Sequence, residues 1–336
     1  MHIDVILDTR ASAAELAELG QLAESCGIRG VWVSSLLDSR DPFTNLAPLA
    51  QTTSRLALGP IAVNPYDTHP VKIAGAFLTL NELAGGRARI VIGGGGEALE
   101  ALDIKPLRRV RAVRECVEIM RAAATGEPVT YDGELYRVRD LRLAWVSAPT
   151  PPLFVGASQP QMLRMAARAA DGIMLSDLPV NNTGLAIETL DGALRDRGKK
   201  RPPFETNVFT AWHVYADRDR ARREARQWLL LRGIFRPWLL KEFLAQEDVD
   251  LVMSNRSAFA EAFTARHHRV AGVPDRILDA LVDHLTLTGD VSTLDEKIEK
   301  LGYFAQAGLS SIALRLYQDP AQSIRLLGER VVPALA

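Results

Sequence analysis

The chain has 336 residues, and its 40 basic side chains nearly balance its 41 acidic ones. Because there is no excess positive charge, binding to nucleic acid or to an anionic membrane surface is not expected. No apolar run reaches the roughly 18 residues of a membrane-spanning helix, and the N-terminus lacks the charged-then-apolar order of a signal peptide. Cys26 and Cys116 lie among apolar neighbours and are expected to be free, buried thiols. We therefore expect a soluble cytoplasmic protein.

Short β-rich runs alternate with amphipathic helical patterns along the chain. Strands are expected at 3–7, 30–34, 56–63, 89–92, 153–155, 172–175, 207–214 and 311–314. Helices are expected at 13–26, 45–53, 70–84, 107–124, 159–169, 184–197, 218–231 and 322–331. A β-hairpin over 129–145 interrupts the alternation.

The repeated order of strand and helix indicates the architecture. About eight such repeats predict an α/β fold, a closed (β/α)8 TIM barrel with insertions rather than an open sheet. One domain over 1–336 accommodates the pattern, with a helical insertion at about 235–282 after the seventh strand. This insertion either closes the site or serves only packing.

The stretch 58–96 carries the most information about a ligand site. It reads LGPIAVNPYDTHPVKIAGAFLTLNELAGGRARIVIGGGG. Asn64-Pro65 ends the first strand, because proline has no backbone donor and a fixed φ, and Gly85-Gly86 ends the helix. The run Gly93–Gly96 leaves bare backbone just beyond the next strand. Small ligands bind at this end of the strands in parallel α/β proteins, so a ligand site is expected here.

Four ordered blocks resemble a known family. They are LGPIAVNPYDTHP, TLNELAGGRARIVIGGGG, DIKPLRRVRAVRECVEIMR and FVGASQPQMLRMAARAADGIMLS, and a weaker block, LTGDVSTLDEKIEKLGYFAQAGLSSIAL, follows near the C-terminal end. They resemble the luciferase-like flavin and deazaflavin oxidoreductases, and best the methylenetetrahydromethanopterin reductase branch, which uses coenzyme F420. The resemblance implies hydride transfer between the deazaflavin and a small organic substrate, and a homodimer.

The resemblance also implies which residues hold the cofactor. Ile61, Ala62 and Val63 match a strand bulge with a non-proline cis peptide that supports the cofactor ring in family members. Gly156, Ala157 and Ser158 match the loop that holds the cofactor phosphate, and a helix start there would expose unpaired N–H groups. Ser176 either borders the phosphate or is a turn residue. The other expected cofactor contacts are Ser35, Asn64, Gly93 and Gly94.

The chain departs from the family at a position that bears on catalysis. Many deazaflavin-dependent relatives carry an Asp-His pair after the second strand, where this chain has Ser35-Leu36. A proton, if the reaction needs one, must come from elsewhere, and the candidates are Asp8, Asp38 and His69. No HxH, HExxH or clustered Cys/His spacing predicts a metal site, and no G-x-S-x-G predicts a nucleophile elbow.

Two other functions stay open from the sequence. The same barrel and phosphate loop would serve an FMN-dependent, oxygen-using monooxygenase of the luciferase-like kind. The Ser35-Leu36 replacement also leaves room for a protein that binds a deazaflavin or flavin without catalysis. Cofactor preference and oxygen consumption would separate these alternatives.

Overall fold

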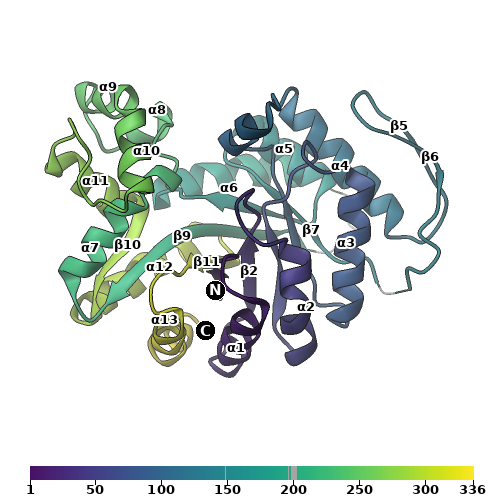
Figure 1. Cartoon of the computed structure of the whole chain (residues 1–336), viewed down its shortest axis with the longest axis horizontal. Coiled ribbons are helices and arrows are strands. Elements are labelled where there is room, and N and C mark those ends of the chain that lie inside the picture. The colour runs from purple at the N-terminus through teal and green to yellow at the C-terminus, as the bar shows by residue number, and fades with distance from the viewer. Residues whose placement is uncertain (148, 196, 198–202) are drawn as a thin grey trace.

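The computed structural model describes residues 1–147, 149–195, 197 and 203–336 (Figure 1). Its main sheet is a nearly closed barrel of parallel strands in the order β3-β2-β1-β11-β9-β8-β7-β4. The isolated pairs Leu58↔Ala88 and Val63↔Ile92 connect the two end strands, β3 and β4. The strands are β1 (His2–Leu7), β2 (Gly30–Ser34), β3 (Ala57–Ile61), β4 (Ile90–Ile92), β7 (Leu153–Gly156), β8 (Gly172–Ser176), β9 (Glu205–Tyr215) and β11 (Ser311–Arg315). The predicted (β/α)8 barrel is confirmed.

Helices surround the barrel, and local sequence signals start several of them. Ser12 and Glu15 form a capping box before the first helix, and Asp41 and His69 accept backbone N–H bonds at the starts of the next two. The surrounding helices are α1 (Ala13–Ser25), α2 (Pro42–Thr52), α3 (Pro70–Leu83), η1 (Glu97–Leu102), α4 (Arg109–Ala123), α5 (Pro160–Ala169), α6 (Val180–Leu194), η3 (Val291–Thr293), α12 (Leu294–Gln306), α13 (Pro320–Leu326), η4 (Leu327–Val331) and α14 (Val332–Leu335). No helix in the described ranges is both long and apolar enough to cross a membrane.

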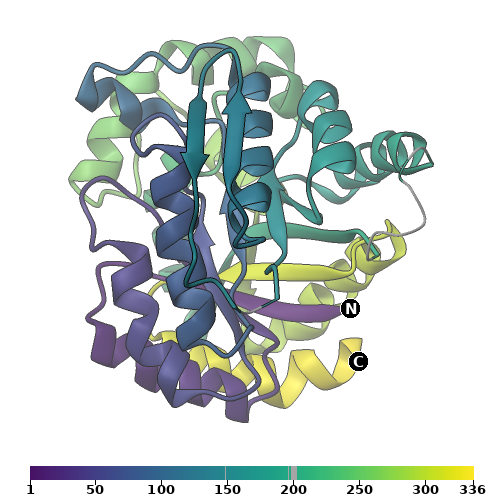
Figure 2. The ribbon, with the colours of Figure 1, turned by 90° about the vertical axis from the view of Figure 1, so that its right-hand side faces the viewer.

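The predicted hairpin forms and lies outside the ring of helices. Strands β5 (Val129–Asp132) and β6 (Arg137–Leu141) pair antiparallel and lie beside α3 and α4 (Figure 2). Glu115 of α4 accepts the backbone N–H groups of residues 134–136, and Tyr136 donates to the Pro65 carbonyl at 2.7 Å. The hairpin is therefore fixed both to α4 and to the loop that follows β3.

Strand β9 extends beyond the barrel, a feature not expected from the sequence. Residues Asn207 to Ala211 of β9 pair with β11, whereas Ala211 to Tyr215 pair with an additional strand, β10 (Thr286–Asp290). Strand β10 therefore begins where β11 ends. Its sequence, TLTGD, is short, contains glycine and has no clear apolar alternation, so sequence analysis did not identify it.

A helical lobe occupies the chain between β9 and β10, on the left of Figure 1. It contains α7 (Arg218–Gln227), η2 (Leu229–Leu231), α8 (Pro237–Leu240), α9 (Gln246–Ser254), α10 (Arg256–Thr264) and α11 (Asp275–Leu285). Arg222 and Arg226 of α7 both form ion pairs with Asp279 of α11, at 2.6 and 2.8 Å. These contacts hold the two ends of the lobe together beside β9.

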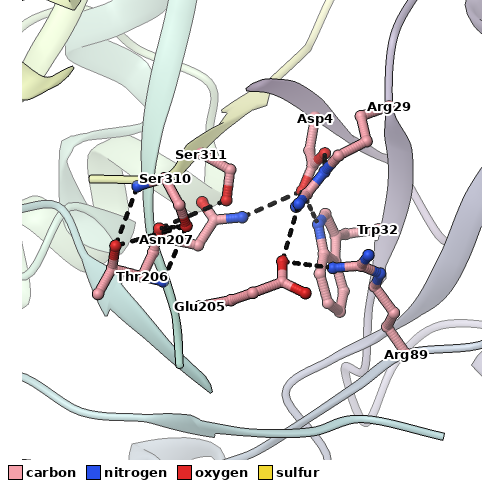
Figure 3. Close-up of polar contacts among 9 residues, drawn as sticks. All are labelled: Asp4, Arg29, Trp32, Arg89, Glu205, Thr206, Asn207, Ser310 and Ser311. Carbon is pink, nitrogen blue, oxygen red and sulfur yellow. Dashed lines mark hydrogen bonds and ion pairs between the residues drawn. The ribbon is translucent and has the colours of Figure 1, made fainter. Parts of the chain in front are cut away.

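The barrel interior has an apolar layer above a polar one. The apolar layer contains Ile6, Trp32, Ile61, Val91, Phe154, Met174 and Ala313. Below it, at the amino ends of the strands, Asp4 accepts hydrogen bonds from Arg29, from Trp32 Nε1 at 2.9 Å and from Asn207 Nδ2 at 3.0 Å (Figure 3). Glu205 bridges Arg29 and Arg89 at 2.8 and 2.7 Å. This network closes the amino end of the barrel, so a ligand site must lie at the carboxyl end.

Candidate active site

Polar side chains face the carboxyl end of the barrel, one layer above the apolar interior. Ser34 and Arg315 lie two residues beyond Trp32 and Ala313 on their strands, so all four point inward. Arg315 donates to the Ser34 hydroxyl across the interior. The barrel therefore presents a polar layer at the end where the sequence predicts the site.

The non-proline cis peptide expected after β3 is present. The peptide bond between Ile61 and Ala62 is cis, as the family resemblance implied. The Ser35 N–H donates to the Ile61 carbonyl at 2.9 Å, and the Gly93 N–H donates to the Val63 carbonyl at 2.8 Å. A Cβ built on Gly93 would lie only 3.1 Å from the Ala62 Cβ. These hydrogen bonds and this close approach bring five of the predicted cofactor residues together.

Asn64 and Gly94 border these residues but have local structural roles. The Asn64 side-chain oxygen accepts the N–H groups of Tyr66 and Asp67 at 3.0 and 3.2 Å, which defines a turn. A Cβ on Gly94 would lie 3.3 Å from the Arg109 Cβ, so the glycine run packs closely on the start of α4. Both residues shape the loops around the cis peptide.

The predicted phosphate loop lies between β7 and α5. Gly156 ends β7, and the Ala157 N–H donates to the Met174 carbonyl of the neighbouring strand at 3.1 Å. Helix α5 begins just after Ser158, and its N-cap residue, Gln159, makes no side-chain bond to the first turn. The N–H groups of that turn therefore have no side-chain cap, and this favours an anion.

Ser176 ends β8 and is hydrogen-bonded to an arginine of the helical lobe. Its hydroxyl donates to the Asp177 carboxylate at 3.3 Å, as in the turn alternative. Its carbonyl accepts from Arg236 Nη1 at 3.2 Å. Sequence analysis did not identify Arg236, because its position at the mouth depends on how the lobe folds back.

The three predicted proton carriers are not brought together in one place. Arg10 forms ion pairs with Asp38 at 2.7 Å and with Asp8 at 3.8 Å, and all three side chains are more than a third exposed. The hydrogen bond from Arg10 lowers the pKa of Asp38. His69 is an exposed N-cap whose Nδ1 accepts the Val71 N–H at 3.2 Å. These residues lie on the rim or at a helix start rather than in the interior.

A buried His–Glu–Tyr group lies on the extension of β9. His213 Nδ1 is 2.8 Å from a Glu224 oxygen that also accepts from the Tyr215 hydroxyl, and the imidazole stacks on Tyr317 at 4.4 Å. Burial lowers the pKa of His213 although Glu224 opposes this, and burial raises the pKa of Tyr317. At neutral pH the imidazole is neutral, and the Glu224 carboxylate favours the tautomer with a proton on Nδ1.

Two aromatic side chains of this group, and two arginines near them, each leave a polar atom without a partner. Among the described residues, His213 Nε2 and the Tyr317 hydroxyl are buried and make no hydrogen bond, and the same holds for the Nε atoms of Arg232 and Arg315. Arg232 also forms an ion pair with Asp177 at 2.8 Å in which both side chains are almost fully buried. Buried donors and acceptors without partners are expensive, so their presence indicates a place for a polar ligand.

Sequence analysis assigned no role to His213, Arg315 or Tyr317. The sequence does carry a signal for them, because these three residues alternate with buried core residues along their strands. His213 lies on β9, and Arg315 and Tyr317 lie on and just after β11. The buried Arg232 gave only a weak signal, as a charge inside the apolar run LLLRGIF. Its partner, Asp177, could not be identified without the fold.

The parallel barrel, whose amino end is closed by the polar network, defines an α/β-barrel protein with its ligand site expected at the carboxyl ends of the strands. The chain belongs to the luciferase-like monooxygenase family, whose model matches residues 1–311.

Curated relatives and solved structures agree with this assignment. The 5,10-methylenetetrahydromethanopterin reductase of Archaeoglobus fulgidus is 32% identical over 329 residues, which cover 96% of each protein. The F420-dependent glucose-6-phosphate dehydrogenase of Nakamurella multipartita is 26% identical, with 96% and 92% covered. The structure of the coenzyme F420 dependent tetrahydromethanopterin reductase from Methanopyrus kandleri superposes with a TM-score of 0.79 at 20% identity, over 100% of this chain and 99% of that one. This last similarity supports the fold.

Proposed function

We propose that this protein is a coenzyme F420-dependent oxidoreductase that transfers a hydride between the deazaflavin and a small organic substrate. The observation that carries the proposal is the backbone at Ile61–Val63, which at the carboxyl end of the barrel is hydrogen-bonded on one side to Ser35 and on the other to Gly93. Relatives that cover nearly the whole chain and whose names specify F420 support the choice of cofactor.

The residues at the mouth fit such a cofactor. A Cβ at Gly93 would make an unusually tight contact with Ala62, so glycine suits this position, and its bare backbone suits a flat ring. We assign the ring to Ser35, Ile61, Ala62, Val63 and Gly93, with Asn64 and Gly94 at its border. We assign the phosphate to Gly156, Ala157, Ser158 and Ser176, where the uncapped start of α5 and the nearby Arg236 favour an anion. When bound, the deazaflavin supplies a carbon that donates or accepts the hydride.

The chain's own chemical contribution is positioning, exclusion of water and, where the substrate needs it, proton transfer. Asp8, Asp38 and His69 are proposed proton carriers on the rim. The buried His213 is a further candidate, because its Nε2 is unpartnered and Glu224 orients the imidazole. Arg232 and Arg315 lie in the same interior and suit an electronegative substrate group. We propose that the part of the lobe at about 235–282 covers this substrate side.

The first test is a titration of the purified protein with coenzyme F420 and, separately, with FMN, with fluorescence quenching as the readout. The proposal requires selective binding of F420, with a dissociation constant in the micromolar range or below. Preference for FMN, together with oxygen consumption during turnover, would instead support the luciferase-like monooxygenase alternative. Tight binding of F420 without hydride transfer to or from a broad substrate panel would support the non-catalytic alternative.

We also propose that the protein is a cytoplasmic homodimer. The dimer rests on the family resemblance and on large apolar side chains exposed beside α2 and α3, among them Leu83 and Trp145, which are 39% and 45% exposed. Sedimentation equilibrium measures the mass directly, and a mass near 36.8 kDa would contradict the dimer.

A further inference from the structure

A groove rich in arginine runs between α4 and α5 on the outside of the barrel. It has a volume of about 1220 Å³. Seven arginines line it, against two glutamates, Glu118 and Glu134. The arginines are Arg108, Arg109, Arg111, Arg114, Arg121, Arg164 and Arg168. We call this feature the arginine groove. The chain as a whole is nearly neutral, so the charge is concentrated here.

One end of the arginine groove adjoins the proposed cofactor site. Arg109 at this end packs against Gly94 of the glycine run. Gln161, which also lines the groove, lies in the first turn of α5, three residues after Ser158 of the proposed phosphate loop. A ligand whose phosphate lies at the start of α5 can therefore continue along the arginine groove.

The carboxylates near the groove neutralise only part of its positive charge. Glu134 is shared between Arg108 and Arg111, at 2.8 Å from each, and Arg121 pairs with Asp171 at 2.8 Å. Glu118 lies 3.8 Å from Arg114 Nε, but within the described part of the chain no carboxylate pairs with Arg109 or Arg164. The groove thus has more guanidinium donors than its own residues satisfy.

The spacing of the arginines favours an extended anion over a compact one. Along α4 they extend from Arg108 to Arg121, which corresponds to about 20 Å of helix. Arg164 and Arg168 are one helical turn apart on the facing helix. A single phosphate would need donors that converge on one point, whereas two facing rows of guanidinium groups match carboxylates repeated along a chain.

We propose that the arginine groove binds the anionic tail of the cofactor, a chain of glutamyl carboxylates that continues from the phosphate of coenzyme F420. This inference rests on the proposed function and assigns a second part of the same ligand. Surface guanidinium–carboxylate pairs are individually weak and sensitive to salt, so the tail should increase affinity mainly at low ionic strength.

The test compares three ligands: the deazaflavin chromophore without a tail, F420 with a short tail, and F420 with a long tail. Affinities are measured for the wild type and for the double variant Arg109→Ala/Arg164→Ala, at low and high salt. We expect the long tail to increase wild-type affinity about ten-fold at low salt, and we expect the double variant to lose this gain. Affinity for the tailless chromophore should be the same in both proteins.

A matched control is the double variant Arg276→Ala/Arg330→Ala, which removes two exposed arginines outside the groove. It should keep the full effect of the tail. Equal wild-type affinity for all three ligands would overturn the groove assignment alone, as would an equal loss in the control. Failure of every form to bind would overturn the proposed function and this assignment with it. Tighter groove binding of a single-stranded oligonucleotide than of an oligoglutamate of equal charge would also overturn it.

Discussion

At the scale of single residues, the unpartnered polar atoms give the clearest indication of chemistry. His213 Nε2 and the Tyr317 hydroxyl lie inside the protein with no hydrogen bond among the described residues. Glu224 fixes the imidazole from the other side at 2.8 Å. A histidine that is oriented by a carboxylate and has its second nitrogen free is suited to proton transfer.

The substitution His213→Asn should lower kcat about 100-fold and leave the F420 dissociation constant nearly unchanged, because it removes the imidazole from the substrate side only. The matched variant is His69→Asn, in which asparagine still caps α3 and kcat should change little. Steady-state kinetics and cofactor titration measure both effects. If activity were lost in His69→Asn alone, His69 rather than His213 would be the residue that transfers the proton.

The same histidine predicts the pH dependence of turnover. Burial holds the pKa of His213 below its ordinary value of 6.5, and Arg232 and Arg315 lower it further while Glu224 raises it. Nε2 is thus available at neutral pH and is lost only as the pH falls below 6.5. We expect an acidic limb in kcat/KM with an apparent pKa below 6.5. A pH profile that keeps this limb in His213→Asn would exclude His213 as its source.

Ser35-Leu36 illustrates what the sequence could show at this scale. The missing Asp-His pair was visible directly, and it raised the question of proton supply. The answer was not visible, because Glu224 and Arg232 come from the lobe while His213 and Tyr317 come from strand ends. Such long-range contacts depend on the fold rather than on local sequence patterns.

At the scale of elements, the predicted ends of the eight barrel strands lie within two residues of the observed ends. Helix α2 begins at Pro42, earlier than the expected residue 45, because Asp41 caps it and proline is favourable in the first turn. Helix α6 begins at Val180 rather than 184, directly after Pro179. Strand β10 could not be predicted, since its existence depends on pairing with the extension of β9.

Two glycines on neighbouring elements give opposite predictions for stability. A Cβ on Gly59 of β3 would lie 1.7 Å from the Arg89 carbonyl oxygen, whereas a Cβ on Gly75 of α3 would meet no atom within 4 Å. Gly59→Ala should therefore lower the free energy of unfolding by about 3 kcal/mol or more, because backbone must move. Gly75→Ala should raise it by about 0.5–1 kcal/mol, since alanine favours helices.

Urea denaturation of the two variants checks this prediction. A Gly59→Ala protein as stable as the wild type would mean that β3 and the strand beside it are not packed as closely as described. The comparison also bears on the site, because Gly59 lies two residues before the cis peptide bond between Ile61 and Ala62.

At the scale of the whole molecule, the polar network at the amino end of the barrel holds distant parts of the chain together. Asp4 is almost fully buried and joins Arg29 and Trp32 to Asn207. Burial favours the neutral acid, but Arg29 and the hydrogen bonds hold the pKa of Asp4 below its ordinary value of 3.8. A lowered pKa means that this stabilisation is present above 3.8 and is lost as the pH falls below it.

The substitution Asp4→Asn should lower the free energy of unfolding by about 2–3 kcal/mol, because it removes one of the two counter-charges of Arg29 and a buried carboxylate that accepts from Trp32 and Asn207. The control is Asp38→Asn, which removes an exposed partner of Arg10 and should cost less than about 1 kcal/mol. Thermal or urea unfolding at pH 7 and at pH 3 measures both. Equal losses in the two variants would contradict the structural role of the network.

In the proposed assignment, the long strand β9 divides the chain into a part that holds the cofactor and a part that faces the substrate. The proposed ring and phosphate residues lie between Ser35 and Ser176, while the lobe and the unpartnered atoms of His213, Arg232, Arg315 and Tyr317 lie between 213 and 317. We therefore expect the chain between β9 and β10 to determine substrate preference without determining the cofactor. Chimeras that swap 216–285 between family members should retain the cofactor of the recipient and acquire the substrate preference of the donor.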